Sequence, residues 1–347
     1  MNLLLILAIV FGVLVLVRIA NVAQMAAELS GESEEDEQDK SNKWNSIGYL
    51  LFMIGMFALI GYGLINWTPL MLPVAASEHG VEVDNLMNIN WAVLFVVFFI
   101  TQFLLFWFAY KYRYNKNRRS FYFHDNNKLE AIWTIVPTIV LAGLIVTGLV
   151  EWNKITDRAK SEDGVKIQIY AKQFDFTARY AGTDNKLGAS YFKNITDVNP
   201  LGVDTMDAAV NDDRMSSELV MPVGSEIELV INSRDVIHSV YLPHFRVQMN
   251  AVPGMTTRFH FKPTVTSAKM KEITGTDKFE YILLCNKICG VAHYNMKMPV
   301  RVVEKDEYNS WLKGTKMAYT KATDAPAEAA PAAPAATDST AKPMASK

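Results

Sequence analysis

The chain has 347 residues, of which half are hydrophobic and 20% are charged, and its formal net charge is −2. This balance argues against a wholly disordered chain. It also provides no concentrated basic surface, so we expect no nucleic-acid partner. Cys285 and Cys289 are the two cysteines of the sequence. Two are too few for a disulfide-scaffolded miniprotein or a four-cysteine metal cluster.

Four apolar blocks in the N-terminal half predict a membrane anchor in a lipid bilayer. Residues 47–65, 91–110 and 131–150 run for 19, 20 and 20 positions without a charge. A helix of this length crosses a hydrocarbon core of about 30 Å. The first block, residues 3–17, spans the core only if Arg18 snorkels to the interface. A cleaved signal peptide is the alternative, which the absence of a basic residue at the start disfavours.

The loop between the third and fourth blocks predicts the orientation. Its six basic residues make it cytoplasmic by the positive-inside rule, so the fourth helix delivers the following residues to the opposite face. The acidic stretch 32–39 is interpreted as a solvated loop. The basic residues are Lys111, Arg113, Lys116, Arg118, Arg119 and Lys128.

The C-terminal half has the pattern of a β domain. Apolar residues alternate with polar ones in five runs, and glycine and proline separate the runs, as in a sandwich or barrel. The residues after Tyr319 are rich in alanine and proline and predict a disordered tail. The runs are 165–169, 227–231, 258–261, 281–284 and 300–303. The predicted domains are 1–45 (helix and acidic loop), 46–68 (extra helix), 90–152 (transmembrane hairpin), 160–316 (β domain) and 317–347 (tail).

The chemistry is concentrated in one short segment and one distant histidine. Cys285, Cys289, His293 and Met296 follow one another at spacings of four, four and three. Thiolate, imidazole and thioether form the soft-ligand set that suits copper. His238 lies 47 residues upstream of Cys285, between two predicted strands. Loops at strand ends meet in a sandwich, so both histidines can face one site.

Two other interpretations remain open at this point. Cysteines of an exported domain commonly form a disulfide, although closure across three intervening residues strains many backbones. Zinc would use both cysteines and both histidines, which leaves Met296 without a role. Taken alone, His238 would be an ordinary histidine and Met296 a core side chain.

The motif Cys-x-x-x-Cys-x-x-x-His-x-x-Met resembles that of subunit II of the haem–copper cytochrome c oxidases. Asp-Val-Ile-His-Ser at 235–239 and Asn-Ala-Val-Pro-Gly at 250–254 strengthen the resemblance, as does the segment 124–137 before the last apolar helix. The resemblance covers residues 91–311. It implies a transmembrane hairpin and a cupredoxin-like Greek-key barrel or sandwich on the periplasmic face of a bacterial inner membrane.

The resemblance also implies a dinuclear copper centre, CuA. This centre would take electrons from cytochrome c and pass them to haem in subunit I, where oxygen is reduced and protons are pumped. Two bridging thiolates distinguish it from a single blue copper, which needs one cysteine. The implied ligands are Cys285 and Cys289 as bridges, His238 and His293 as caps, and Met296 and the backbone oxygen of Lys287 as weak ligands.

Three positions depart from the family's pattern. Lys287 stands where the family usually has a glutamate, and Asn250 where it has an aspartate. Both changes argue against the family's interface magnesium site in its usual form, because a cation cannot replace a carboxylate there. Phe174 stands where a tryptophan usually receives electrons. We assign electron entry to Phe174, with an ordinary strand residue as the alternative.

Charge and position suggest further roles. Residues 151–316 hold 22 basic and 21 acidic residues, a balance of +1, so we expect no global acidic field for a basic cytochrome. We therefore expect a membrane-held or complex-bound cytochrome donor. The residues that could still form a local acidic field are Asp204, Asp207, Asp212, Asp213 and Glu218.

The resemblance implies that Glu130 lies at the entrance of a proton path into subunit I. The alternative is that its charge simply favours the start of a helix.

A second function class is a membrane-tethered copper-binding or copper-delivery protein without an oxidase partner. The hairpin and Glu130 disfavour it, because a tether needs one helix. A nitrous-oxide-reductase-type domain is more remote, since the chain lacks that enzyme's catalytic domain. We expect the extra helices near 3–22 and 47–65 to pack against other subunits of a larger complex.

Overall fold

The computed structural model describes residues 3–29, 34–115, 117–156 and 164–319 of the chain. These residues belong to two compact units, which we describe separately. The first unit consists of Met1–Ala75 and Val81–Asn153, and the second of Ala76–Gly80 and Lys154–Lys347.

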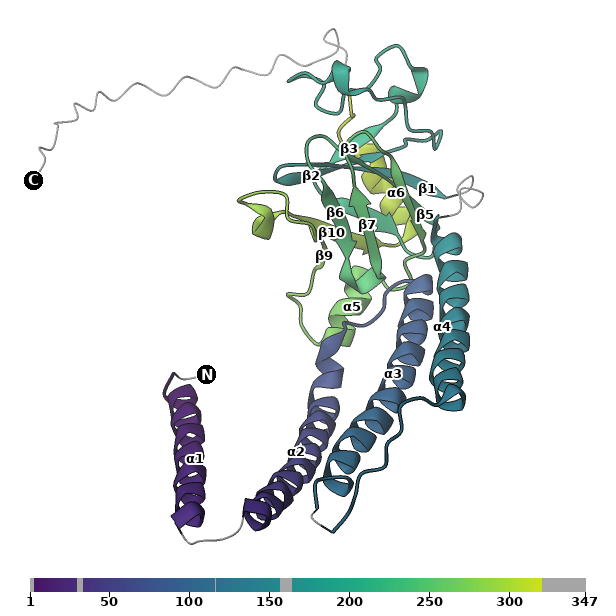
Figure 1. Ribbon diagram of the computed structural model, residues 1–347. Helices are drawn as coiled ribbons and strands as arrows, with labels where there is room; N and C mark the ends of the chain where they lie inside the picture. Colours follow the sequence, from purple (N-terminus) through teal and green to yellow (C-terminus); the bar gives the residue numbers. More distant parts are fainter. Residues whose placement is uncertain (1–2, 30–33, 116, 157–163, 320–347) are drawn as a thin grey trace, which may run out of the picture. The chain divides into compact units, whose positions relative to one another are not determined.

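Long helices dominate the N-terminal half (Figure 1). Three of them are long and apolar enough to cross a membrane, as predicted, and their apolar stretches are almost entirely exposed. Such surface is stable only against lipid or another protein. The first predicted block is also helical, with a shorter apolar stretch at Val10–Ala23. The helices are α1 (Leu3–Leu29), α2 (Glu34–Met71), α3 (Glu78–Lys111) and α4 (Asn127–Thr156).

Helix α2 corrects one prediction. It begins at Glu34, so residues 34–39, which we predicted as part of a solvated loop, are helical. Acidic residues are favoured in the first turns of a helix by the helix dipole, which explains why the helix extends beyond its apolar block. Further along, Phe57 of α2 packs edge-on against Phe99 of α3, with ring centroids 5.1 Å apart. Aromatic contacts therefore join these two helices.

The start of α4 is fixed by a side-chain cap. The Asn126 side-chain oxygen accepts hydrogen bonds from the backbone N–H groups of Lys128 and Leu129, both at 3.1 Å. Asparagine at this position satisfies amides that have no partner within the helix. Glu130 therefore lies in the first turn of α4, where a negative charge is favourable.

The second unit is a β-sandwich of two five-stranded sheets, with orders β3-β2-β1-β5-β8 and β4-β10-β9-β6-β7. The five predicted runs are confirmed as β1, β5, β8, β9 and β10, whereas the other five strands were not predicted. The strands are β1 (Val165–Lys172), β2 (Asp175–Tyr180), β3 (Arg214–Ser216), β4 (Leu219–Pro222), β5 (Ile227–Ser233), β6 (His238–Leu242), β7 (Val247–Ala251), β8 (Thr257–Phe261), β9 (Tyr281–Leu284) and β10 (Lys297–Val303). Two short helices, α5 (Ser267–Thr274) and α6 (Lys305–Gly314), complete the unit.

The core lies between the two sheets and follows the period-two pattern. Ile167 and Ile169 of β1 pair in parallel with Leu229 and Ile231 of β5, and all four side chains are fully buried. Burial of such side chains contributes roughly 1.5–3 kcal/mol each. The central strands thus form a rigid support for the loops at the sandwich ends.

An insertion between β2 and β3 covers part of the outer sheet face. Tyr170 of β1 packs there with Leu201, Val203 and Val210, and all four are buried. The final described residues also join this region, because the Ala318 N–H donates to the Asp213 carbonyl at 2.8 Å. Residues 317–319 of the predicted tail therefore run along the sandwich, and residues 320–347 lie outside the described residues.

Candidate metal centre

Two sandwich strands bring His238 and the cysteine segment together. His238 is the first residue of β6 and pairs with Ala251 of β7. We expected it between strands, so its place within the ladder is a correction. On its other side β6 pairs with β9 through Tyr241 and Leu284, and Leu284 directly precedes Cys285. Sheet pairing therefore positions a histidine and a cysteine that are 47 residues apart in the sequence.

The segment 285–296 forms a closed loop between β9 and β10. The Cys285 N–H donates to the Met296 carbonyl at 3.1 Å, which ties the two ends of the loop together. A short 3₁₀ turn, His293–Asn295, turns the chain back toward the first cysteine. Four donor side chains at spacings of four, four and three thus converge within a single loop.

Each cysteine sulfur faces one imidazole nitrogen. The His238 Nδ1 atom lies 3.9 Å from Cys285 Sγ, and the His293 Nδ1 atom lies 3.6 Å from Cys289 Sγ. The two Sγ atoms are 3.9 Å apart and both cysteines are free. This separation excludes the disulfide interpretation in this structure, since a disulfide bond is about 2.05 Å long.

Two weaker donors complete the cluster. The Met296 Sδ atom lies 3.7 Å from Cys289 Sγ, and the backbone oxygen of Lys287 lies 3.2 Å from Cys285 Sγ. Met296 is almost completely buried. The structure therefore brings together all six predicted donors, with a thioether near one thiol and a carbonyl near the other.

Burial makes the cluster a poor place for bare charges. His238 is fully buried, and Cys285 and Cys289 are 9% and 5% exposed. Burial, and next the neighbouring Cys285, raise the pKa of the Cys289 thiol to about 11. A thiol binds a metal only after losing its proton, so a metal cation at this cluster would supply the charge that stabilises the thiolates.

Asp235 fixes the orientation of the His238 ring. Its Oδ1 atom lies 2.7 Å from His238 Nε2, and its Oδ2 atom accepts the Gln173 N–H at 2.7 Å. Partial burial opposes ionisation, but the hydrogen bonds from Gln173 and His238 hold the pKa of the Asp235 carboxyl below its ordinary value. A proton shared between Nε2 and Asp235 leaves Nδ1 free to bind a metal.

We expect Asp235→Asn to lower the metal affinity of the chain by about 10- to 100-fold, the range typical of outer-shell partners. An amide can present its NH₂ group to Nε2 and so reverse the preferred tautomer of His238. Competition titration with a copper chelator measures the effect. Asp175→Asn, a change to an exposed carboxylate paired with Lys172, is the matched control and should leave the affinity unchanged.

Phe174 and Gln173 close one side of the loop. The Gln173 amide donates to the Cys289 carbonyl. A Cβ atom on Gly290 would approach the Phe174 ring and the Gln173 amide nitrogen to 2.8 Å, and the φ of Gly290 is +141°. Glycine is required at this position because any side chain would displace both residues. Phe174, the predicted electron-entry residue, therefore lies directly against the residue that follows Cys289.

The donor chemistry fits copper. His238, Cys285 and Cys289 place their ligand atoms within 4.8 Å of one another. A four-coordinate zinc site would use two cysteines and two histidines and have no use for the thioether. Copper accepts all three donor types. The buried thiols, the oriented imidazole and the nearby thioether therefore agree best with a copper centre.

The comparisons with known proteins decide the family. Residues 65–149 match the transmembrane domain of cytochrome c oxidase subunit II, and residues 166–304 match its periplasmic domain. The chain belongs to the cytochrome c oxidase subunit II family. The predicted family, the cupredoxin-like β domain and the link to copper and electron transport are thereby confirmed.

Curated relatives span most of the chain. The alternative cytochrome c oxidase subunit 2 of Bradyrhizobium diazoefficiens is 29% identical and covers 72% of this chain and 84% of its own length. Cytochrome c oxidase subunit 2 of Thermostichus vulcanus is 27% identical, with coverages of 70% and 78%. A crystal structure of the periplasmic domain of subunit II of cytochrome oxidase from Bradyrhizobium japonicum is 26% identical and covers 44% of this chain and 94% of that chain, with a TM-score of 0.30.

Most of the acidic residues that could have formed a local acidic field in this subunit II chain are bonded within the β domain. Asp213 is fully buried and forms an ion pair with Arg179. Glu218 pairs with Arg301 at 3.0 Å. Asp207 and Asp212 accept backbone hydrogen bonds within the insertion, from Ala189, Ala209, Thr183 and Asp184. Asp207, Asp212 and Asp213 therefore hold the insertion in place, and Glu218 joins the start of β4 to β10.

Asp235 and Gln173 are the residues of the site that sequence reasoning missed. Asp235 belongs to the Asp-Val-Ile-His-Ser motif but received no role of its own. A carboxylate three residues before a candidate histidine ligand can indicate a group that orients the histidine ring. Gln173 gave no signal, because its contact with the Cys289 carbonyl depends on the approach of the β1–β2 turn.

Proposed function

We propose that the chain is the electron-entry subunit of a terminal oxidase, accepting electrons from a c-type cytochrome and passing them to haem in subunit I, where oxygen is reduced to water. The observation that supports this most is the pair of free thiols 3.9 Å apart, each facing one imidazole nitrogen. A dinuclear copper centre bound by these residues supplies one-electron transfer with little change in geometry.

The residues of the chain have distinct roles in this proposal. Cys285 and Cys289 would hold the copper as thiolates, and His238 and His293 would each supply an imidazole ligand. Met296 and the Lys287 carbonyl act as weak ligands. Asp235 holds the His238 ring, and the side chains of Cys285, Cys289 and Met296 are themselves buried. Such a rigid ligand shell keeps the reorganisation on electron transfer small.

Phe174 is the proposed point of electron entry. Its ring is partly buried and lies against Gly290, so it links the surface to the metal loop. We infer that the donor is a membrane-held or complex-bound cytochrome, because the exported domain has nearly balanced charge and two of its acidic residues are paired internally. Electrostatic steering of a soluble basic cytochrome needs an acidic field that this domain lacks.

The donor hypothesis predicts slow turnover with a soluble basic cytochrome and a rate that changes little with salt. Attraction between exposed opposite charges weakens with rising ionic strength, so a steered encounter would slow down steeply. Oxygen uptake measured over a series of salt concentrations tests this. Rapid turnover that falls steeply with salt would refute the hypothesis.

The proposed location is a bacterial inner membrane, with the β domain on the periplasmic face. Six basic residues lie at the end of α3, in the following loop and at the start of α4, and they support a cytoplasmic position for that loop. The exposed apolar helices support association with subunit I and other oxidase subunits as well as lipid. We assign no magnesium site, because Lys287 and Asn250 replace the carboxylates that such a site uses.

Glu130 is proposed to lie at the entrance of a proton path into subunit I. We expect Glu130→Gln to reduce turnover by roughly tenfold or more, since a positioned proton-transferring group is typically worth 10²–10⁴-fold. Oxygen uptake by the assembled oxidase measures it. Glu151→Gln is a control at the opposite end of α4. Unchanged turnover in the Glu130 variant would mean that this carboxylate only stabilises the start of α4 through the helix dipole.

The function is tested by purifying the chain from its native membrane. An electron-entry subunit co-purifies with a haem-containing subunit, and the complex consumes oxygen when supplied with a reduced c-type cytochrome. The alternative, a membrane-tethered copper-delivery protein, would purify without haem and transfer copper to an acceptor. Co-purification with haem but oxidation of quinol alone would contradict a cytochrome donor.

A further inference from the structure

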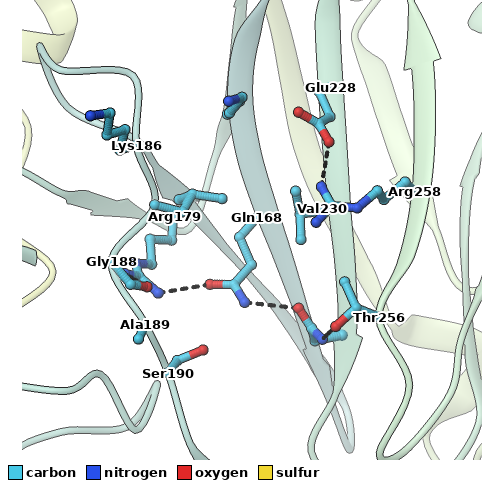
Figure 2. A pocket seen from close by; sticks show the side chains of 13 residues that line it. Gln168, Arg179, Lys186, Gly188, Ala189, Ser190, Glu228, Val230, Thr256 and Arg258 are labelled. Carbon is cyan, nitrogen blue, oxygen red and sulfur yellow. Dashed lines mark hydrogen bonds and ion pairs between the residues drawn. The ribbon is translucent and has the colours of Figure 1, made fainter. Parts of the chain in front are cut away.

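A second site lies on the outer face of the β3-β2-β1-β5-β8 sheet. A cavity of about 600 Å³ opens there between the sheet and the loop that follows β2. Figure 2 shows Lys186, Gly188, Ala189 and Ser190 on the loop side. Glu228, Val230, Thr256 and Arg258 line the sheet side. None of the residues that line the cavity belongs to the histidine and cysteine cluster, so the two sites are distinct.

The loop that forms one wall is fastened to the sheet. The Asn185 side chain accepts the Lys166 N–H at 3.2 Å and donates to the Gly164 carbonyl at 2.7 Å. Arg179, fully buried, donates to the Gly188 carbonyl at 2.5 Å. These contacts hold the wall in place without a ligand, so the cavity is preformed, as small-molecule sites usually are.

The cavity carries an excess of positive charge. Four cations line it, and of these Arg179 is paired with the buried Asp213 and Arg258 with Glu228. Lys166 and Lys186 have no ion-pair partner among residues 164–319. Two lysines without an ion-pair partner in this part of the chain, both lining one cavity, favour an anionic ligand.

The floor of the cavity consists of amide, hydroxyl and carboxylate side chains, which can form hydrogen bonds with hydroxyl groups of a ligand. Gln168, 6% exposed, donates to Asn232 at 2.8 Å, and Asn232 donates to Thr256 at 2.9 Å. Glu228 is 2% exposed, and its Oε2 atom has no hydrogen-bond partner within the described structure. A buried carboxylate oxygen without a donor is costly, and because this atom is covered, the Glu228 side chain would have to turn toward the cavity to accept a ligand hydroxyl and offset that cost.

We propose that this cavity binds a phosphorylated sugar. The lysines Lys166 and Lys186 would hold the phosphate through charge-assisted hydrogen bonds. Glu228 Oε2 would accept from a sugar hydroxyl, and the amides of Gln168 and Asn232 would bind neighbouring hydroxyls. Neither inorganic phosphate nor a neutral sugar satisfies both halves of the site. The same chemistry occurs in soluble sugar phosphates and in phosphorylated polyol head groups of lipids.

Isothermal titration calorimetry on the purified oxidase complex tests the proposal, with glucose 6-phosphate as the probe and glucose and inorganic phosphate as its two halves. We expect saturable binding of glucose 6-phosphate that is roughly tenfold or more tighter than that of either half, since charged hydrogen bonds are the stronger kind. Co-sedimentation with vesicles of phosphatidylcholine, with and without phosphatidylinositol, separates a lipid head group from a soluble ligand.

Variants assign the binding to this cavity. Lys166→Gln with Lys186→Gln should weaken glucose 6-phosphate binding by roughly tenfold or more, and Glu228→Gln should weaken binding of the sugar half. Lys278→Gln, a change to an exposed lysine outside the cavity, is the matched control and should have no effect. Absence of saturable binding to both the sugar phosphate and the inositol vesicles, or equal binding by the double-lysine variant, would overturn the proposal. Equal affinity for inorganic phosphate would overturn the assignment of the hydroxyl half.

Discussion

Cys289→Ser is expected to abolish the proposed dinuclear centre and to lower oxidase turnover by more than about 100-fold. Replacing a residue that only hydrogen-bonds to a metal ligand typically costs 10- to 100-fold, and loss of a ligand itself should cost more. The Cys289 sulfur lies close to three other donors: Cys285 Sγ at 3.9 Å, His293 Nδ1 at 3.6 Å and Met296 Sδ at 3.7 Å. Its loss would remove one of the two proposed bridging ligands, and a hydroxyl is a poor ligand for copper. Metal analysis should find one copper or none per chain.

The matched control is Asn286→Ala, because Asn286 is an exposed residue of the same loop that contributes no donor side chain. It should retain two coppers and normal turnover. Met296→Leu should retain the metal with an altered spectrum, since a thioether is a weak ligand. If Cys289→Ser kept two coppers and full turnover, the bridging role of the thiols would be wrong.

Arg179→Leu is expected to have the largest effect on stability. Arg179 is fully buried and bonds to Asp213, to Gln168 at 3.1 Å and to the Gly188 carbonyl. Its removal leaves a buried carboxylate without its counter-charge, which typically costs 3–5 kcal/mol. The thermal midpoint of the exported domain should fall by roughly 10 °C. Near-ultraviolet circular dichroism of the full-length protein follows the transition.

A double variant separates charge from packing. Arg179→Leu with Asp213→Leu should be less destabilised than Arg179→Leu alone, because both charges are then absent. Arg234→Leu, at an exposed position, should leave the midpoint nearly unchanged. If Arg179→Leu lowered the free energy of unfolding by less than about 1 kcal/mol, the Arg179–Asp213 pair would contribute no more than an ordinary surface ion pair, and the prediction would be wrong.

Much of the architecture was predictable because it follows from local patterns. Charge-free stretches long enough to span a bilayer identified the three long apolar helices, and alternation identified β1, β5, β8, β9 and β10. The cysteine loop was also predictable, since its four donors lie within one short segment. Patterns of this kind need no knowledge of tertiary structure.

Other features depend on contacts between distant residues. Gln168 of β1 has the alternating polar position of a solvent-facing residue, yet it is buried at the floor of the cavity beneath the loop after β2. Asp213 resembles a surface acid and is instead the partner of Arg179. The strands β6 and β7 were missed, and it is pairing with each other and of β6 with β9 that stabilises them. Such features come from the tertiary fold and not from local sequence.

The most direct test of the central claim is electron paramagnetic resonance of the copper-loaded protein together with its copper content. Two thiolates shared by two metals predict two coppers per chain and a mixed-valence signal in which one unpaired electron is shared equally between two copper nuclei. A single copper with a blue-copper spectrum would contradict the account, as would zinc without redox activity.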